Sequence, residues 1–132
     1  MKNYWLVCLP REDLMHCIDI GTFGLARKRI LGNVKNGDQV ICLAGKGDWK
    51  FLALGTATSD YYVDDKQIFL KPGIFIDRFD FKATILPKEL DLMSILGQLT
   101  FVSKIEYWAV YFRSGIVKIS EQDWNLISEH AS

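Results

Sequence analysis

The chain has 132 residues, of which 49% are hydrophobic and 24% are charged. This length suits one domain, spanning residues 1–132, and the hydrophobic fraction excludes an intrinsically disordered chain. The formal net charge is zero, which excludes a strongly basic protein that coats nucleic acid. No apolar run approaches the ~20 residues that cross a bilayer.

The first half of the chain is predicted to alternate strands with short helices. In chain order we expect a strand at 3–9, a helix at 10–18, a glycine-bracketed loop at 20–24, a helical segment at 25–34, a turn and strand at 35–44, a hairpin turn at 45–49 and a returning strand at 50–59. Pro10 is well suited to the entrance of the first helix, and Gly32 to the end of the second.

The second half begins with a long irregular excursion. In chain order we expect this excursion at 60–73, a half-buried strand at 74–86, a helix at 87–99, a strand or its approach at 106–115, a short strand at 116–119 and a helix at 120–130. In the half-buried strand, Phe79 and Phe81 alternate with Asp80 and Lys82. Ser120 and Asp123 form a start that resembles a capping box for the last helix.

These elements amount to about six strands and three or four short helices, with no linker or repeat between them. The strands are not regularly interleaved with long helices, which argues against a doubly wound sheet. We therefore predict an α+β fold with a curled, mixed or antiparallel sheet and helices on its outside. A small barrel of this kind would leave a mouth for a ligand.

The three cysteines indicate reduced, buried thiols. Cys8, Cys17 and Cys42 are odd in number and lack the CxxC or HxxxH spacing of common metal sites. We therefore predict no disulfide framework, no metal and no cofactor. The N-terminal apolar run has no small-residue cleavage site after it, so it predicts a first strand and a cytoplasmic protein without a membrane segment.

Charge is divided unevenly along the chain. Residues 1–50 carry eight Lys and Arg against five Asp and Glu, whereas residues 51–132 carry eight against eleven. The asymmetry is compatible with a basic face for a charged partner and equally with a mixed, solvated surface.

No motif for catalysis is present. The sequence contains neither GxGxxG nor GxxxxGK[ST], and no serine lies in GxSxG. His16 and Cys17 are adjacent, and adjacent residues of a helix point about 100° apart, so they are poorly placed to form a dyad. We predict that the protein is not an enzyme.

Aromatic residues make up 13% of the chain, and several fall where a core does not require them. Phe23 lies between two glycines, Tyr61 and Tyr62 follow a strand, and Trp108 lies beside a charged segment. Aromatic side chains with a nearby Arg grip an unstacked base by stacking and cation–π contact. Composition alone is also compatible with an aromatic-rich core.

Several segments, taken in order, resemble the EVE domain family of the PUA-like superfamily. They are NYWLVCLPRED, the glycine-rich aromatic loop, NGDQVICLAGKG, FLALGTATSDYYVDD and LTFVSKIEYWAVYFRSGIVKISEQDWNLI. The resemblance covers nearly the whole chain, and the YTH domain, which reads methylated adenine in RNA, looks like a relative. It implies a PUA-like pseudo-barrel with a pocket for a single, often modified, nucleobase.

The resemblance also implies roles for particular residues. Phe23 stands where the family commonly has Trp and would form one wall of the pocket, and Gly24 would let the backbone approach the base. The other implied pocket residues are Cys8, Leu9, Pro10, Ser59, Tyr62, Trp108, Phe112 and Arg113. Arg27, Lys28 and Arg29 would hold phosphates at a helix start.

Each of these roles has a structural alternative. Phe23 could plug the barrel, Ser59 could cap a strand, and the cations could be a solvated helix face. Leu9 stands where the family frequently has Ser or Thr, which removes one possible hydrogen bond to the base.

The sequence therefore predicts a non-catalytic nucleic-acid-binding domain that holds one modified base. DNA and RNA, the identity of the modification and the oligomeric state all stay open. One alternative is a sensor that binds a nucleoside or another flat small molecule in the same pocket. Two others are an enzyme on modified nucleotides, which needs a general base, and a protein-interaction module, favoured if the chain's own side chains fill the pocket.

Overall fold

A computed structural model of the protein describes residues 2–26, 28–70 and 75–131. In chain order its elements are β1 (Tyr4–Leu9), α1 (Arg11–Ile20), β2 (Thr22–Leu25), α2 (Lys28–Leu31), β3 (Gln39–Ala44), β4 (Lys50–Ala57), β5 (Tyr62–Val63), β6 (Asp77–Asp91), the 3₁₀ helices η1 (Leu92–Ser94), η2 (Leu96–Gln98) and η3 (Ile105–Phe112), β7 (Ile116–Ile119) and α3 (Glu121–Ala131).

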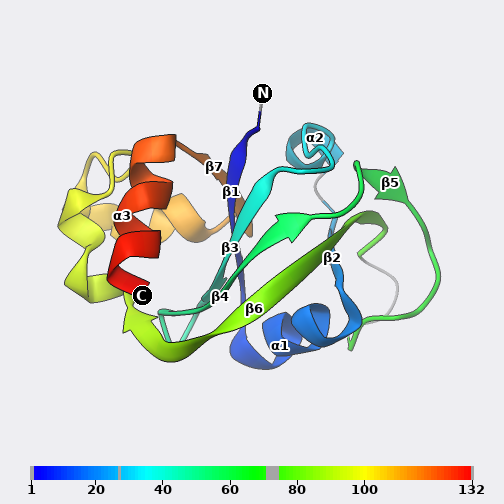
Figure 1. The fold of residues 1–132 in the computed structure, drawn as a ribbon, viewed down its shortest axis with the longest axis horizontal. Coiled ribbons are helices and arrows are strands. Elements are labelled where there is room, and N and C mark those ends of the chain that lie inside the picture. The colour runs from blue at the N-terminus through cyan, green and yellow to red at the C-terminus, as the bar shows by residue number, and fades with distance from the viewer. Residues whose placement is uncertain (1, 27, 71–74, 132) are drawn as a thin grey trace.

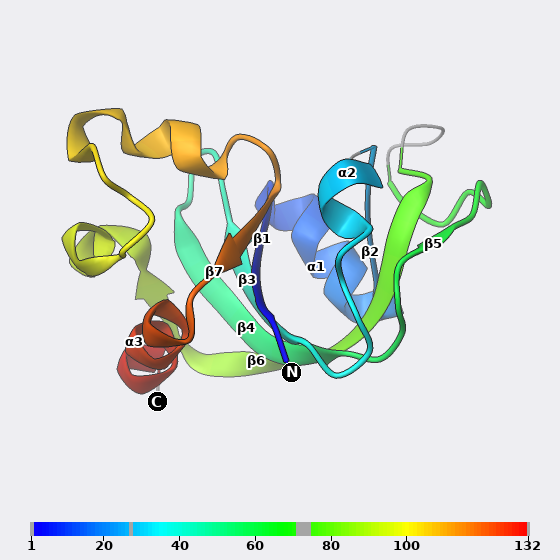
Figure 2. The same ribbon diagram turned by 90° about the horizontal axis from the view of Figure 1, so that it is seen from above.

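The strands form one curled sheet in the order β2-β6-β4-β3-β1-β7, and the two-residue β5 pairs with β6. β1 and β3 are parallel, and the other pairs are antiparallel. Figures 1 and 2 show η1, η2, η3 and α3 grouped at one end of the molecule, opposite β2 and β5. This arrangement confirms the predicted α+β fold, a curled mixed sheet flanked by short helices.

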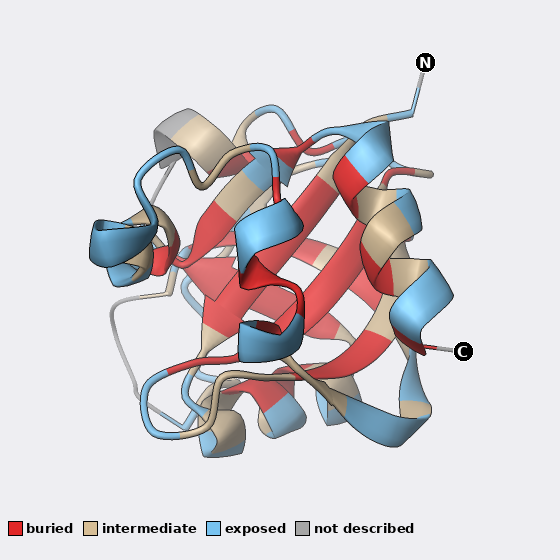
Figure 3. Ribbon diagram, turned by 90° about the vertical axis from the view of Figure 1, so that its left-hand side faces the viewer, coloured by how far each residue is buried: buried red, intermediate tan, exposed pale blue. Residues whose placement is uncertain are grey.

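The central strands are buried on both faces. Trp5 and Val7 of β1 point into a core shared with α1, β2 and β6, whereas Leu6 and Cys8 point into a second core under the 3₁₀ helices and α3. Figure 3 shows these buried strands behind exposed helices. Burial on both faces explains why the first strand reads as a continuous apolar run and not as an alternating one.

The Gly-Asp turn before β3 has a structural role. Gly37 adopts a φ of 96°, and the next residue, Asp38, is 1% exposed. The Asp38 carboxylate accepts hydrogen bonds from the Trp5 indole N–H (2.9 Å) and from the backbone N–H of Asn3 (3.0 Å) and Lys35 (2.9 Å). One buried carboxylate thus ties the start of β1 to the turn that begins β3.

The loop predicted at 20–24 is wrong. Gly21 ends α1 in the left-handed conformation (φ 75°), and Thr22–Leu25 then pair with β6, Phe23 opposite Phe79. The first glycine therefore marks a helix end and not a flexible loop. The four residues of β2 are all buried.

Two predictions in the second half are also wrong. Residues 87–91 continue β6, and only short 3₁₀ turns follow where a helix is predicted at 87–99. Pro87 falls between Ile85 and Leu90, where the pairing with β4 shifts register, so its missing N–H removes no bond from a regular ladder. Residues 105–112 form η3, although their aromatic and branched composition favours a strand.

The last helix begins as predicted, with one difference. The Ser120 hydroxyl accepts a hydrogen bond from the Asp123 backbone N–H at 3.1 Å. The Asp123 carboxylate does not return to Ser120 but accepts hydrogen bonds from the Thr100 backbone N–H (2.9 Å) and hydroxyl (2.7 Å). It thereby fixes the segment after η2 to α3.

All three cysteines are free and buried, as predicted. No helix in the described ranges is long and apolar enough to cross a membrane.

Candidate functional site

The predicted pocket residues separate into two places. Cys8, Leu9, Pro10, Phe112 and Arg113 line one groove, and Trp108 packs beside it. Phe23, Gly24, Ser59 and Tyr62 lie with β2, β4, β5 and β6 on the other side of the sheet's curl.

The groove has a volume of about 570 Å³ and lies between the end of β1, the β3–β4 turn and η3. In Figure 2, η3 (gold to orange) runs across the end of the β3–β4 turn. A hydrogen bond of 2.8 Å from the Cys8 backbone N–H to the Gly115 carbonyl holds the chain that leaves η3 against β1. The volume lies within the ~300–1,000 Å³ of typical small-ligand sites. We call this feature the β1–η3 groove; its lining is Cys8, Leu9, Pro10, Gly45, Lys46, Trp49, Ala109, Phe112 and Arg113.

Trp49 is one of four groove residues that were not predicted from the sequence; the others are Gly45, Lys46 and Ala109. Trp49 adopts a φ of 55°, a left-handed conformation that is uncommon for any residue but glycine. Its backbone is held by bonds to the Gly45 carbonyl (3.2 Å) and from the Leu92 N–H (2.9 Å). Its ring meets Trp108 edge-on at 4.7 Å and Phe112 at 5.8 Å. The sequence does contain a signal for this position, because a Trp directly follows a Gly-Asp turn, where Gly or Asn is usual.

Cys8 and Gly45 form a tightly packed wall of the groove. A Cβ on Gly45 would lie 2.8 Å from the Cys8 Sγ, so the site has room only for glycine. Burial raises the pKa of the Cys8 thiol to about 12, which keeps it protonated at neutral pH. Because the thiolate is the nucleophile, this thiol is chemically inert and contributes an apolar surface.

Two cations at the groove are available to a ligand. Lys46 and Arg113 are exposed, and neither forms an ion pair with a residue that the structure describes. The neighbouring Arg11 is already paired, since its guanidinium donates to Asp48 (3.0 Å) and to both oxygens of Glu89 (2.8 and 2.9 Å).

The structure corrects the role of Phe23. Its side chain is 0% exposed and packs against Phe79 with 5.6 Å between ring centroids. A fully buried ring cannot form the wall of an open pocket, so the structural alternative, a plug in the core, holds in this structure.

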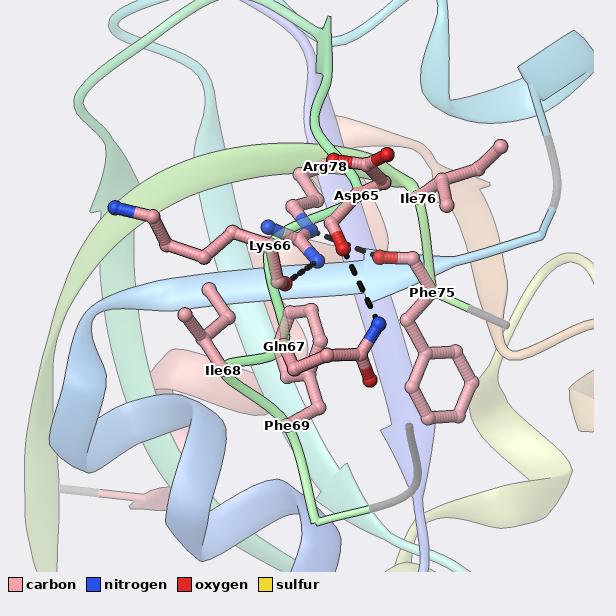
Figure 4. Close-up of a pocket in the computed structure, with 8 residues that line it drawn as sticks. All are labelled: Asp65, Lys66, Gln67, Ile68, Phe69, Phe75, Ile76 and Arg78. Atoms are coloured by element: carbon pink, nitrogen blue, oxygen red, sulfur yellow. Dashed lines mark hydrogen bonds between the residues drawn. The ribbon is translucent and has the colours of Figure 1, made fainter. Parts of the chain in front are cut away.

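Gly24 does admit a flat ring, but that ring belongs to the chain itself. A Cβ on Gly24 would lie 2.7 Å from two ring atoms of Phe69. Figure 4 shows Phe69 with Phe75 and Arg78 among the residues that line a small pocket. The cavity there has a volume of about 10 Å³, which holds at most one water. The Arg78 guanidinium lies 4.9 Å from the centroid of the Phe69 ring and donates to the carbonyls of Phe75 and Lys66. The chain's own side chains therefore fill this pocket.

Ser59 and Tyr62 have structural partners. The Ser59 hydroxyl accepts from the Asp80 N–H (2.9 Å) and donates to the Asp60 carbonyl (2.8 Å). The Tyr62 hydroxyl donates to the Asp80 carboxylate at 2.6 Å, and burial, together with this hydrogen bond, raises the pKa of Tyr62 to about 12. These polar atoms serve the fold and are not directed at the β1–η3 groove.

The predicted phosphate-binding residues are not placed at a site. Arg27 lies outside the described residues, as do the side chains of Lys28 and Arg29. Their phosphate-binding role stays a prediction. In the described ranges, no group of three or more His, Cys, Asp or Glu could hold a metal ion.

Solved structures share this architecture, although the identity between their sequences and this chain is low. No protein-family model and no curated protein matches the chain. A hypothetical protein from Leishmania major superposes with a TM-score of 0.71 and 14% identity, over 98% of this chain and 94% of that one. The Mmi1 YTH domain superposes with a TM-score of 0.65 and 13% identity, over 98% and 75%. Human THYN1, in complex with DNA containing 5-methylcytosine, superposes with a TM-score of 0.65 and 10% identity, over 99% of each chain.

This is the fold of EVE and YTH domains. The match confirms the architecture that the ordered segments predict, a PUA-like pseudo-barrel. Within this EVE/YTH-like fold, the β1–η3 groove is the described site that joins an open cavity, aromatic rings and unpaired cations.

Proposed function

We propose that the protein is a non-catalytic nucleic-acid-binding domain that holds one base, modified by a small apolar group, in the β1–η3 groove. The observation that carries this proposal is the combination of Trp49 and Phe112 with the cations Lys46 and Arg113 around one cavity. The fold supports it, because a YTH domain and THYN1 bound to 5-methylcytosine DNA share this architecture.

The groove offers the interactions that an extruded base needs. Taking a base out of its stack costs a few kcal/mol. Stacking on an aromatic ring returns about 1–3 kcal/mol per base, and the half-buried ring of Trp49 is the surface for it, with the buried Phe112 ring behind it. The strained backbone of Trp49 favours such a role, since strained conformations concentrate at functional sites.

The lining also fits an apolar modification. Leu9, Ala109 and the protonated Cys8 thiol present apolar surface. A methyl group buried against such surface gains about 0.8 kcal/mol. Lys46 and Arg113 would hold the phosphates of the same nucleotide. The planar guanidinium of Arg113 can donate two parallel N–H hydrogen bonds to one phosphate.

The test is a titration of labelled oligonucleotides, read by fluorescence anisotropy at low salt. The ligands are matched DNA and RNA, single- and double-stranded, with and without base methylation or hydroxymethylation. The variants are Trp49→Ala and Arg113→Gln. Their matched controls are Trp124→Ala, on α3 and packed on Tyr4, and Lys118→Gln, exposed on β7.

We expect one methylated ligand to bind several-fold more tightly than its unmethylated match. Trp49→Ala should weaken that binding by about tenfold or more, as loss of one stacking surface requires, and Trp124→Ala should leave it unchanged. Equal affinity for the free nucleoside would favour the small-molecule sensor. If no oligonucleotide binds the folded wild-type protein, the proposal is wrong and the protein-interaction reading gains support, because side chains fill the pocket beside Gly24.

A further inference from the structure

The outer face of η3 carries an unusually exposed tyrosine. Tyr107 is 63% exposed and Val110 is 52% exposed. Three residues make one turn of a 3₁₀ helix, so Val110 and Arg113, the C-cap that directly follows η3, lie on one side of the helix, and Tyr107 stands three residues before Val110 at a bend. We call this row the η3 ridge; it is locally bent, since Tyr107 departs from helical geometry (φ −117°, ψ 29°).

Tyr107 has no structural task that the fold reveals. The chain has five tyrosines. In the described part of the chain, four of their hydroxyls have partners: Tyr4 with Glu121, Tyr61 with Asp77, Tyr62 with Asp80 and Tyr111 with Ser103. The Tyr107 hydroxyl forms no hydrogen bond with a described residue, and its ring lies outside both hydrophobic cores.

The opposite side of η3 packs inward and makes the helix a firm support. Phe112 is buried in the second core, and Trp108 and Tyr111 pack against that core. The Tyr111 hydroxyl also accepts from the Lys104 backbone N–H at 3.1 Å, at the start of η3. Tyr107 is therefore presented to solvent from an element that is anchored on its other side.

The ridge is continuous with the β1–η3 groove. Arg113 belongs to both, because it ends the ridge and lines the groove. At a rise of ~2.0 Å per residue, Val110 lies ~6 Å from Arg113 along the helix, and Tyr107 lies three residues further away, at the bend. Successive nucleotides of a stacked strand lie ~3.4 Å apart and further apart when extended, so a few nucleotides cover this span.

We propose that Tyr107 stacks with a nucleotide that flanks the base in the groove, and that the η3 ridge guides the single strand past Val110 to Arg113. The inference rests on the proposed function and extends it from one base to a short strand. An exposed aromatic ring is the usual platform for a single-stranded base, and it tolerates any base because each has a π face.

The experiment measures how affinity grows with ligand length. The probes are the nucleoside monophosphate of the preferred modified base and single-stranded oligonucleotides with one to four flanking nucleotides on the 5′ or the 3′ side. The proteins are wild type, Tyr107→Ala and Tyr107→Phe, with Ile105→Ala as control. Ile105 is 52% exposed on the same helix, outside the ridge.

For wild type we expect affinity to rise with length on one side only. Tyr107→Ala should abolish that rise, with a loss of about fivefold or more for the longest ligand and none for the monophosphate. Tyr107→Phe, which keeps the ring, and Ile105→Ala should behave as wild type.

Two results overturn the inference. In the first, Tyr107→Ala binds every length as wild type does, so the groove works without the ridge and the proposed function stands. In the second, the Tyr107→Ala protein loses self-association or capture of a protein partner while keeping its oligonucleotide affinity, which assigns the ridge to a protein interface. If wild type binds no ligand at all, the proposed function itself has failed.

Discussion

Gly45 shows how a single residue sets the shape of the groove. Its backbone N–H donates to the Leu9 carbonyl at 2.8 Å, and the Cys8 sulfur fills the space where a side chain would begin. At Gly24, on the other side of the sheet, the Phe69 ring fills the space where a side chain would begin. At both positions glycine permits the close approach of a neighbour, and at both positions that neighbour comes from the chain itself.

We predict that Gly45→Ala lowers the free energy of unfolding by about 1–3 kcal/mol, because the added methyl overlaps the Cys8 sulfur. Cys8→Ala should relieve most of this loss in the double variant, with a coupling of at least about 0.5 kcal/mol. Urea unfolding of the two single variants and the double variant measures the coupling. Gly97→Ala is the control, since its Cβ would meet only the Ile105 Cδ1 at 3.6 Å. Additive effects would show that the overlap does not determine the stability.

At the scale of elements, one buried carboxylate connects α3 to the 3₁₀ segment. Asp123 is 1% exposed and accepts two hydrogen bonds from Thr100. The segment around η1, η2 and η3 has few regular backbone ladders, so such side-chain bonds fix its course. The course of this segment in turn decides where Trp108 and Phe112 meet Trp49.

We therefore predict that Asp123→Ala lowers the free energy of unfolding by about 3 kcal/mol, because the Thr100 backbone N–H loses its charged partner. Denaturation in urea measures the effect. The exposed neighbour Gln122→Ala should change the free energy by less than about 0.5 kcal/mol. A loss for Asp123→Ala as small as that of Gln122→Ala would mean that water replaces the carboxylate without cost.

The elements could be predicted from the sequence where a local pattern agrees with the tertiary environment. The strands β1, β3 and β4 follow from apolar runs, and α3 follows from its cap and its periodicity. The pattern failed for β2, where Gly21 and Gly24 suggest a loop but pairing with Asp77–Asp80 decides the conformation. The pattern also failed for η3, because its aromatic and branched residues pack against the core on one side of a 3₁₀ helix and are exposed on the other side.

At the scale of the whole molecule, charge determines how binding should respond to salt. A protein of zero net charge releases few counterions when it binds nucleic acid, so its affinity should depend less steeply on salt concentration than that of a basic protein. If Lys46, Arg113, Arg27, Lys28 and Arg29 each contact a phosphate of a single strand, log K should fall with log [salt] with a slope of about −3.5. Replacing Arg27, Lys28 and Arg29 with Gln should reduce the slope to about −1.4. Titrations at several salt concentrations measure both slopes, and equal slopes would exclude the three cations from the interface.

The buried thiols make stability depend on pH in the alkaline range. Burial raises the pKa of Cys8 and Cys17 from 9.0 to about 12 and raises that of Cys42 as well. Above pH 9 the unfolded state binds fewer protons than the folded state, so the free energy of unfolding falls as pH rises. Each thiol contributes a fall of about 1.4 kcal/mol per pH unit until its folded pKa is reached.

Urea unfolding at about pH 8 and about pH 10 tests this dependence. The triple Cys→Ala variant should lose less stability between the two values than wild type does. An equal loss in both proteins would show that the thiols titrate alike in the folded and unfolded states.

The amino-acid sequence by itself determined the architecture. Apolar runs, a Gly-Asp turn, a cap and the ordered segments are local features, and they lead to the EVE/YTH-like sheet. The resemblance implied pocket roles for Cys8, Leu9, Pro10, Phe112 and Arg113, which line the candidate groove and whose roles stay a prediction. Only the tertiary structure decided which aromatic rings are open to a ligand. Phe23 is buried because β2 pairs with β6, and Trp49 lines the groove because a left-handed turn directs it at η3. Whether a ring is buried depends on neighbours that are distant in sequence, and a local sequence pattern does not identify those neighbours.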